Sequence, residues 1–211
     1  MLNDKGTHML CSKWKPERGV SLIELMVGLL IGLIVIAAVG SVYVSAARSS
    51  SEILAANRLN QEIRTLMDLM SFEIRRSGFG IEPALESIAI HDNGSCIVYR
   101  YQFDGNERNA GFRLNSNQIE LKEGGTLADC TQGTWTPITD IGMVTVTALT
   151  FDTSTSECFD GLTNDKTDCS ALATGVVVRR IAIDADAELT ADQSVAMQAR
   201  ETVRVRNDRV I

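Results

Sequence analysis

The chain has 211 residues, with 20 lysines and arginines against 27 aspartates and glutamates, and its formal net charge is −7. This length allows one membrane segment and one modest domain. The acidic balance argues against a nucleic-acid partner, because proteins that bind phosphate backbones carry a basic surface.

An uncharged segment near the amino terminus predicts a membrane-spanning helix. Residues 25–44 contain no charged side chain. As a helix they would extend about 30 Å, which is the thickness of the hydrocarbon core of a bilayer. Basic residues outnumber acidic ones in the segment before them, which favours a cytoplasmic amino terminus and an exported remainder. We therefore predict a transmembrane helix over residues 20–47.

Glu24 is an acid at the start of this apolar helix. A charge within hydrocarbon costs on the order of 2.5–3.5 kcal/mol, so an acid retained there indicates a functional role. The sequence Arg18-Gly19-Val20 offers a cleavage point before the apolar run, whereas a secretory signal is cleaved behind its apolar core. Cleavage after Gly19 would remove residues 1–19 and leave the helix on the mature chain.

Residues 19–25, Gly-Val-Ser-Leu-Ile-Glu-Leu, resemble the class III signal of the type IV pilin superfamily. The resemblance implies that prepilin peptidase cuts after Gly19 and methylates the new amino terminus on Val20. It also implies that Glu24 pairs with the terminal amine of a neighbouring subunit, since pairing offsets the cost of burying either ion. Val20 departs from the family pattern, in which most members carry Phe. The alternative is an ordinary single-pass signal anchor.

A second, amphipathic half of the helix is predicted over residues 48–82. No proline occurs between Pro16 and Pro83. Apolar residues recur at steps of three and four, which is typical of a helix with one buried face; they are Ile53, Ala56, Leu59, Ile63, Leu66, Met67, Met70 and Ile74. Gly78 and Gly80 follow, so the helix is expected to end at Ser77.

Residues 83–211 are predicted to form a β-rich head, which gives an α+β fold with antiparallel strands. Turn sequences at 92–94 and 116–117 separate runs of β-forming residues. The polar segment 184–192 is predicted to be a loop. The expected strands are 87–91, 95–102, 111–115, 118–123, 143–151, 174–184 and 194–206.

Four cysteines lie beyond the membrane segment, where an oxidising compartment favours disulfides, and Cys11 lies in the leader. Four cysteines allow three connectivities. The pairs Cys96–Cys130 and Cys158–Cys169 are favoured, because the second closes a short local loop. Zinc is disfavoured, because the sequence has no Cys-x-x-Cys motif and no histidine near the cysteines.

The segment between Cys158 and Cys169 is rich in oxygen ligands of the kind that Ca²⁺ prefers. Its candidate ligands are Asp160, Asn164, Asp165 and Asp168. Their spacing departs from the EF-hand pattern, and a solvated acidic turn is the alternative. No other cofactor is expected.

The sequence does not predict an enzyme. Its histidines are His8, in the leader, and His91, which stands beside Asp92 at the end of a predicted strand. A solvated turn explains His91 better than a catalytic base. The glycine patterns that bind nucleotide phosphates are absent from the sequence.

Residues 67–79, with Arg75-Arg76-Ser-Gly78-Phe79, and the closing residues 202–207 are similar to PilW-type minor pilins. That resemblance implies an inner-membrane protein with a periplasmic head, which later joins the tip of a type IV pilus. The implied partners are the other minor pilins, the major pilin, a PilY-family tip adhesin, prepilin peptidase and the inner-membrane assembly platform. The implied role is initiation of pilus assembly, in support of adhesion and twitching motility. Alternatives are a J-type minor pseudopilin of type II secretion and a membrane-anchored periplasmic binding module.

Overall fold

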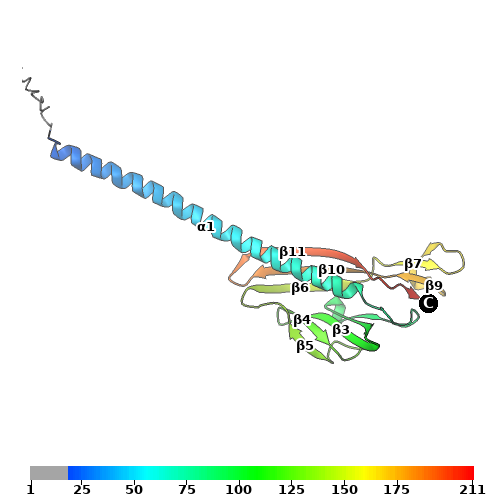
Figure 1. The fold of residues 1–211 in the computed structure, drawn as a ribbon. Coiled ribbons are helices and arrows are strands. Elements are labelled where there is room, and N and C mark those ends of the chain that lie inside the picture. The colour runs from blue at the N-terminus through cyan, green and yellow to red at the C-terminus, as the bar shows by residue number, and fades with distance from the viewer. Residues whose placement is uncertain (1–18) are drawn as a thin grey trace, which may run out of the picture. The chain divides into compact units, whose positions relative to one another are not determined.

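The computed structural model describes residues 19–211 (Figure 1). The chain divides into two compact units, Met1–Ser50 and Ser51–Ile211. A helix of 54 residues, α1 (Leu22–Arg75), begins in the first unit and ends in the second. The predicted long helix is therefore confirmed, and its end lies two residues before the expected Ser77.

Glycines terminate α1, as the sequence predicted. The Ser77 N–H donates to the carbonyl oxygen of Ile74 at 3.0 Å, which closes a tight final turn. Gly78 and Gly80 then have φ angles of +75° and +71°. Glycine adopts this left-handed region without the steric penalty that a side chain brings.

The first sheet of the second unit is an antiparallel meander in the order β1-β2-β3-β4-β5. Ser116 and Asn117 both have positive φ, the conformation of a two-residue hairpin turn, so the hairpin predicted there is confirmed. Asp104 and Gly105 form a second turn of this kind, which the sequence analysis missed. The strands are β1 (Ile88–His91), β2 (Cys96–Phe103), β3 (Asn106–Asn115), β4 (Gln118–Glu123) and β5 (Thr134–Pro137), and a short 3-10 turn, η1 (Asp92–Gly94), joins β1 to β2.

Two further antiparallel sheets complete this unit. One has the order β11-β10-β6, formed by β6 (Val144–Asp152), β10 (Arg180–Leu189) and β11 (Asp192–Arg204). The other has the order β12-β9-β7-β8. Its elements are β7 (Glu157–Asp160), β8 (Lys166–Thr167), β9 (Gly175–Val178) and β12 (Arg209–Val210), with a second 3-10 turn, η2 (Cys169–Ala171), between β8 and β9.

The prediction of a loop over residues 184–192 is wrong. Residues up to Leu189 belong to β10, and β11 starts at Asp192. Ala185, Ala187 and Leu189 are buried, while the acids between them lie on the other face of the strand. The acidic composition therefore hid an alternation of period two, which is the pattern of a half-buried strand.

The single strand predicted over residues 174–184 is also wrong, because two strands occupy this segment. β9 ends at Val178 and β10 begins at Arg180, and the two belong to different sheets. Arg179 lies at the break between them and is buried.

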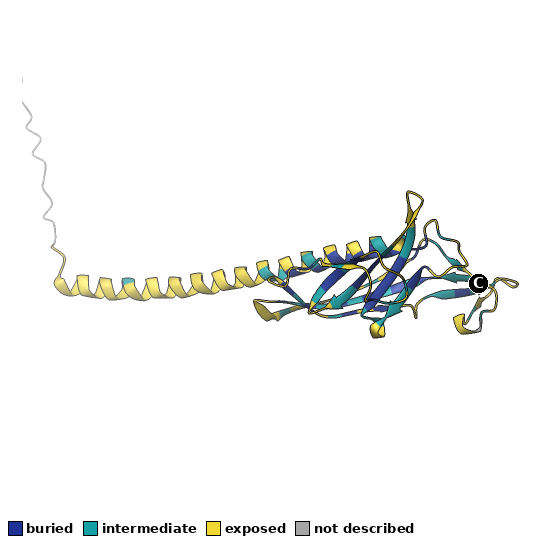
Figure 2. Cartoon of the chain, turned by 90° about the horizontal axis from the view of Figure 1, so that it is seen from below, coloured by how far each residue is buried: buried dark blue, intermediate teal, exposed yellow. Residues whose placement is uncertain are grey.

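The core of the second unit lies between the carboxyl-terminal half of α1 and the sheets, where Figure 2 shows the buried residues of both. Ile53 departs from the predicted buried stripe, since its side chain is 59% exposed. The helix residues of the core are Leu59, Ile63, Leu66, Met67, Met70 and Ile74, and they share one cluster with Tyr99, Phe112, Ile119, Val146, Ile181 and Ile183.

Disulfides join Cys96 to Cys130 and Cys158 to Cys169, which are the pairs favoured from the sequence. They enclose loops with sequence separations of 34 and 11 residues. Both Cys96 and Cys130 are buried, and they pack against Val98, Leu127 and Trp135 in a small satellite core.

We expect the longer disulfide to stabilise the protein more than the shorter one. The chain-entropy model gives about 4 kcal/mol for Cys96–Cys130 and about 3 kcal/mol for Cys158–Cys169. The free energy of unfolding of the paired serine variants, measured by denaturant titration, checks this order. A larger loss for Cys158→Ser with Cys169→Ser would contradict it.

Stability should also fall in acid, because of the loop that carries Cys130. Asp129 accepts hydrogen bonds from the backbone N–H groups of Gln132 and Thr131 and from the Thr131 hydroxyl. These bonds lower the pKa of Asp129 to about 2. Its contribution is therefore present above its unfolded pKa near 3.9 and is lost as the pH falls through about 2. Denaturant titrations at pH 7 and pH 3 should show a smaller acid loss for Asp129→Asn than for the wild type, and an equal loss would refute this assignment.

Candidate functional site: the amino-terminal part of helix α1

The first turn of α1 carries the acid that the sequence analysis singled out. The Leu25 N–H donates to the carbonyl oxygen of Ser21 at 3.2 Å, so Ser21 supplies the first acceptor of the helix. Glu24 lies in this first turn. A carboxylate is favoured there, because the unpaired N–H groups give the helix end a partial positive charge.

Around Glu24 the helix presents a continuous apolar surface. Between Leu22 and Val44 every large hydrophobic side chain is exposed, and the helix colours as exposed along this half in Figure 2. By length and composition α1 is apolar enough to cross a membrane, and none of its most apolar window is buried in the described chain. Such a surface requires lipid or other helices to cover it.

The Glu24 carboxylate has no ion-pair partner among residues 19–211. The next polar side chains on this apolar surface are Ser41 and Tyr43. A cation for Glu24 must therefore come from outside the described part of the chain.

Gly19 and Val20 precede the helix and are exposed. A Cβ atom added at Gly19 would meet no atom within 4 Å. No atom of the described residues therefore crowds Gly19. The rest of the predicted leader, residues 1–18, lies outside the described residues.

Two of the four predicted calcium ligands, Asp160 and Asp168, act as turn caps. Asp160 Oδ1 accepts from the N–H groups of Leu162 and Thr163, and Asp168 Oδ1 accepts from the N–H of Ser170. These bonds lower the pKa of both carboxyls. Among the described residues, Asp160, Asp165 and Asp168 do not gather within metal-binding distance of one another.

Calcium binding through Asp160, Asn164, Asp165 and Asp168 stays a prediction. A calorimetric titration of the whole protein with Ca²⁺ checks it: a saturable heat at millimolar calcium, lost in Asp160→Asn, would support the site, and no heat would end it.

The structure places His91 in a structural contact. Its Nε2 lies 2.8 Å from the carbonyl oxygen of Leu127, on the loop that carries Cys130. Within the described chain, Asp92 also lies within metal-binding distance of the sulfurs of Cys96 and Cys130, but their disulfide leaves no thiolate to bind a metal.

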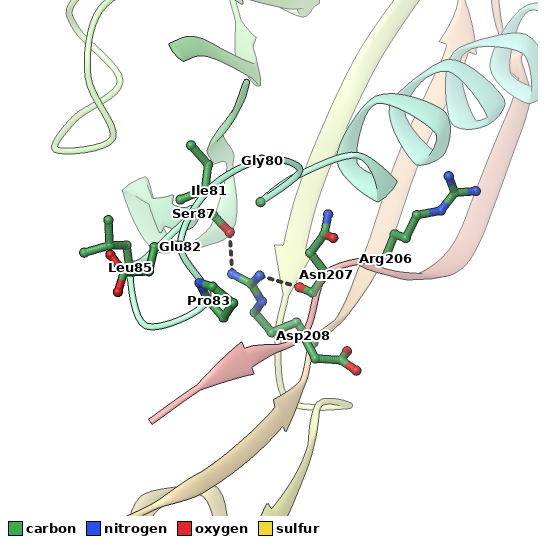
Figure 3. Close-up of a pocket in the computed structure, with 11 residues that line it drawn as sticks. Gly80, Ile81, Glu82, Pro83, Leu85, Ser87, Arg206, Asn207 and Asp208 are labelled. Carbon is green, nitrogen blue, oxygen red and sulfur yellow. Dashed lines mark hydrogen bonds between the residues drawn. The ribbon is translucent and has the colours of Figure 1, made fainter. Parts of the chain in front are cut away.

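A second group of residues, which the sequence analysis missed, surrounds Arg179 (Figure 3). Its guanidinium donates to Ser87 Oγ and to the carbonyl oxygen of Asn207, each at 2.7 Å. Asn207 in turn donates to the carbonyl oxygen of Ser77 at 3.1 Å. The pair Arg179-Arg180 interrupts the apolar run 175–183, and this interruption was the available signal in the sequence. The partners of Arg179 lie far away in the sequence, so they could not be predicted.

Comparison with known proteins assigns the family. The prokaryotic N-terminal methylation motif matches residues 14–40. The model of prepilin peptidase-dependent protein B matches residues 52–205, which is more than half of the chain. The chain belongs to this family. Together the two matches confirm the resemblance to the type IV pilin superfamily, and with it the expected fold class.

Other known proteins resemble this chain only weakly. No curated protein matches. Among solved structures, a type IV-like pilin from Thermus thermophilus is similar at 12% identity, with a TM-score of 0.46, over 71% of this chain and 98% of that chain.

Proposed function

We propose that this protein is a minor pilin that takes part in initiating the assembly of a type IV pilus. One observation carries the proposal: an exposed apolar helix with a single unpartnered carboxylate in its first turn. The match to the methylation motif supports it, because that motif covers the same residues. The role is assembly and not catalysis.

In this proposal the chain is processed before it is used. Prepilin peptidase removes residues 1–19 and methylates Val20, and residues 20–47 then lie first in the inner membrane and later in the filament core. Glu24 pairs with the terminal amine of a neighbouring subunit, which compensates two charges in an apolar environment. Residues 48–82, which are the rest of α1 and the turn that follows it, support the head, residues 83–211, which is exported.

The finer role rests on the resemblance to PilW-type minor pilins. We propose that the protein joins other minor pilins and a PilY-family adhesin at the pilus tip and primes the addition of the major pilin by the assembly platform. Adhesion and twitching motility would then depend on it.

Deletion of the gene, with complementation, tests this role. We expect lost surface pili and lost twitching, with normal secretion of exoproteins. Lost secretion with normal twitching would instead identify a minor pseudopilin of type II secretion. A chain that retains its leader in the native cell would identify a membrane-anchored binding module.

A further inference from the structure

A pocket of about 310 Å³ opens beside Arg179. Its walls come from the loop after α1, residues 78–87, and from residues 206–208 near the carboxyl terminus (Figure 3). We call it the Arg179 pocket. It lies wholly within the second compact unit, and no residue of the apolar part of α1 lines it.

No carboxylate lies within ion-pair distance of Arg179 in the described chain, although Glu86 and Asp208 attract its charge from farther away. The side chain is 7% exposed, its hydrogen-bond acceptors are the neutral oxygens of Ser87 and Asn207, and its Nε has no partner. Burial lowers the pKa of the guanidinium. A buried charge that is only partly compensated is costly, so an anion beside it would be stabilising.

The nearest carboxylates are already paired with other cations. Glu86 Oε2 lies 2.5 Å from Arg209, and Asp208 Oδ2 lies 3.1 Å from Arg204. Of these two acids only Asp208 lines the pocket, and Arg204 partly neutralises it. Glu82 lines it as well, but Glu82 is exposed, so solvent screens its charge.

Gly78 avoids crowding the guanidinium of Arg179. A Cβ atom at this position would lie 3.3 Å from Arg179 Nη2 and 3.0 Å from Ser87 Oγ. Because φ of Gly78 is also +75°, a side chain would be strained as well as crowded. The absence of a side chain at Gly78 therefore leaves space beside the Arg179 guanidinium.

We propose that the Arg179 pocket binds a carboxylate group. Its geometry suits a small, singly charged anion, because one buried guanidinium with a forked set of donors faces a cavity several times the volume of a water molecule. The carboxylate comes either from a free organic acid or from an acidic side chain of another protein. This proposal is independent of the role of Glu24.

Saturation-transfer NMR of acetate with the full-length protein in detergent tests the proposal. We expect a saturable signal for the wild type in acetate, unaffected by chloride at matched ionic strength. Arg179→Gln should weaken acetate binding at least ~10-fold, the loss expected for a hydrogen-bonded charged group. Arg58→Gln is the matched control, because Arg58 is an exposed arginine of the same compact unit that does not line the pocket, and it should keep acetate binding within about twofold.

Competition then identifies the source of the carboxylate. If N-acetylglutamate amide displaces acetate and its glutamine analogue does not, the pocket accepts an acidic side chain. If acetate binds and the glutamate compound does not compete, the ligand is a small free acid. No saturable acetate signal in the wild type would overturn the proposal, whether or not Arg179→Gln folds. Equal acetate binding by folded Arg179→Gln and the wild type would overturn it too.

Discussion

Replacing Glu24 with alanine is expected to reduce the amount of this protein in sheared pili by on the order of a hundredfold. Removing one member of a buried ion pair costs about 3–5 kcal/mol, because the other charge stays buried without a partner. Here the stranded charge would be the amine of the neighbouring subunit. Membrane insertion should persist, since the variant segment is more apolar than the wild type. Immunoblots of sheared-pilus and membrane fractions measure both effects.

Glu52→Ala is the matched control for Glu24→Ala. Glu52 is an exposed acid on the same helix, beyond the predicted membrane segment. This variant should enter pili at the wild-type level, and Glu24→Asp should recover part of the lost incorporation. Normal recruitment of Glu24→Ala into sheared pili would contradict the proposed ion pair.

Replacing Gly19 with a bulky residue such as tryptophan should leave the protein uncleaved and absent from pili. We expect the substitution to leave the described chain undisturbed, since a Cβ atom at Gly19 would meet nothing within 4 Å. The retained leader would keep its basic residues attached to the helix, and each charge resists transfer into hydrocarbon by about 2.5–3.5 kcal/mol. The intact mass of the membrane-extracted variant reports the uncleaved leader directly.

Val20→Phe controls for the position next to Gly19. It introduces the residue that most of the type IV pilin superfamily carries, so cleavage and incorporation should both continue. Cleavage of Gly19→Trp at the wild-type rate would refute the assigned cleavage point.

The sequence predicted those features that depend on neighbouring residues. The long helix follows from the absence of proline and from apolar spacing, and its end follows from Gly78. The hairpin at Ser116 and Asn117 follows from residues that tolerate positive φ. Glu24 stood out because one acid in an apolar helix contrasts with everything around it.

Features that depend on distant residues could not be predicted in this way. The acids of β10 suggested a loop, because only the packed sheet shows that the alanines between them are buried. The short strand β5 (Thr134–Pro137) pairs with β4, and a run of four residues is too short for its alternation to predict a strand. The Arg179 pocket joins Ser87, Arg179 and Asn207, whose proximity exists only in the folded head.

The proposed function requires a new positive charge, the amine at Val20, to neutralise the acid one turn into an apolar helix. Mass spectrometry of the intact protein purified from its native cell tests this most directly. If this amine is formed, the purified chain begins at N-methylated Val20. A chain that still begins at Met1 would contradict the proposed function, because the amine that Glu24 is proposed to bind would never be formed.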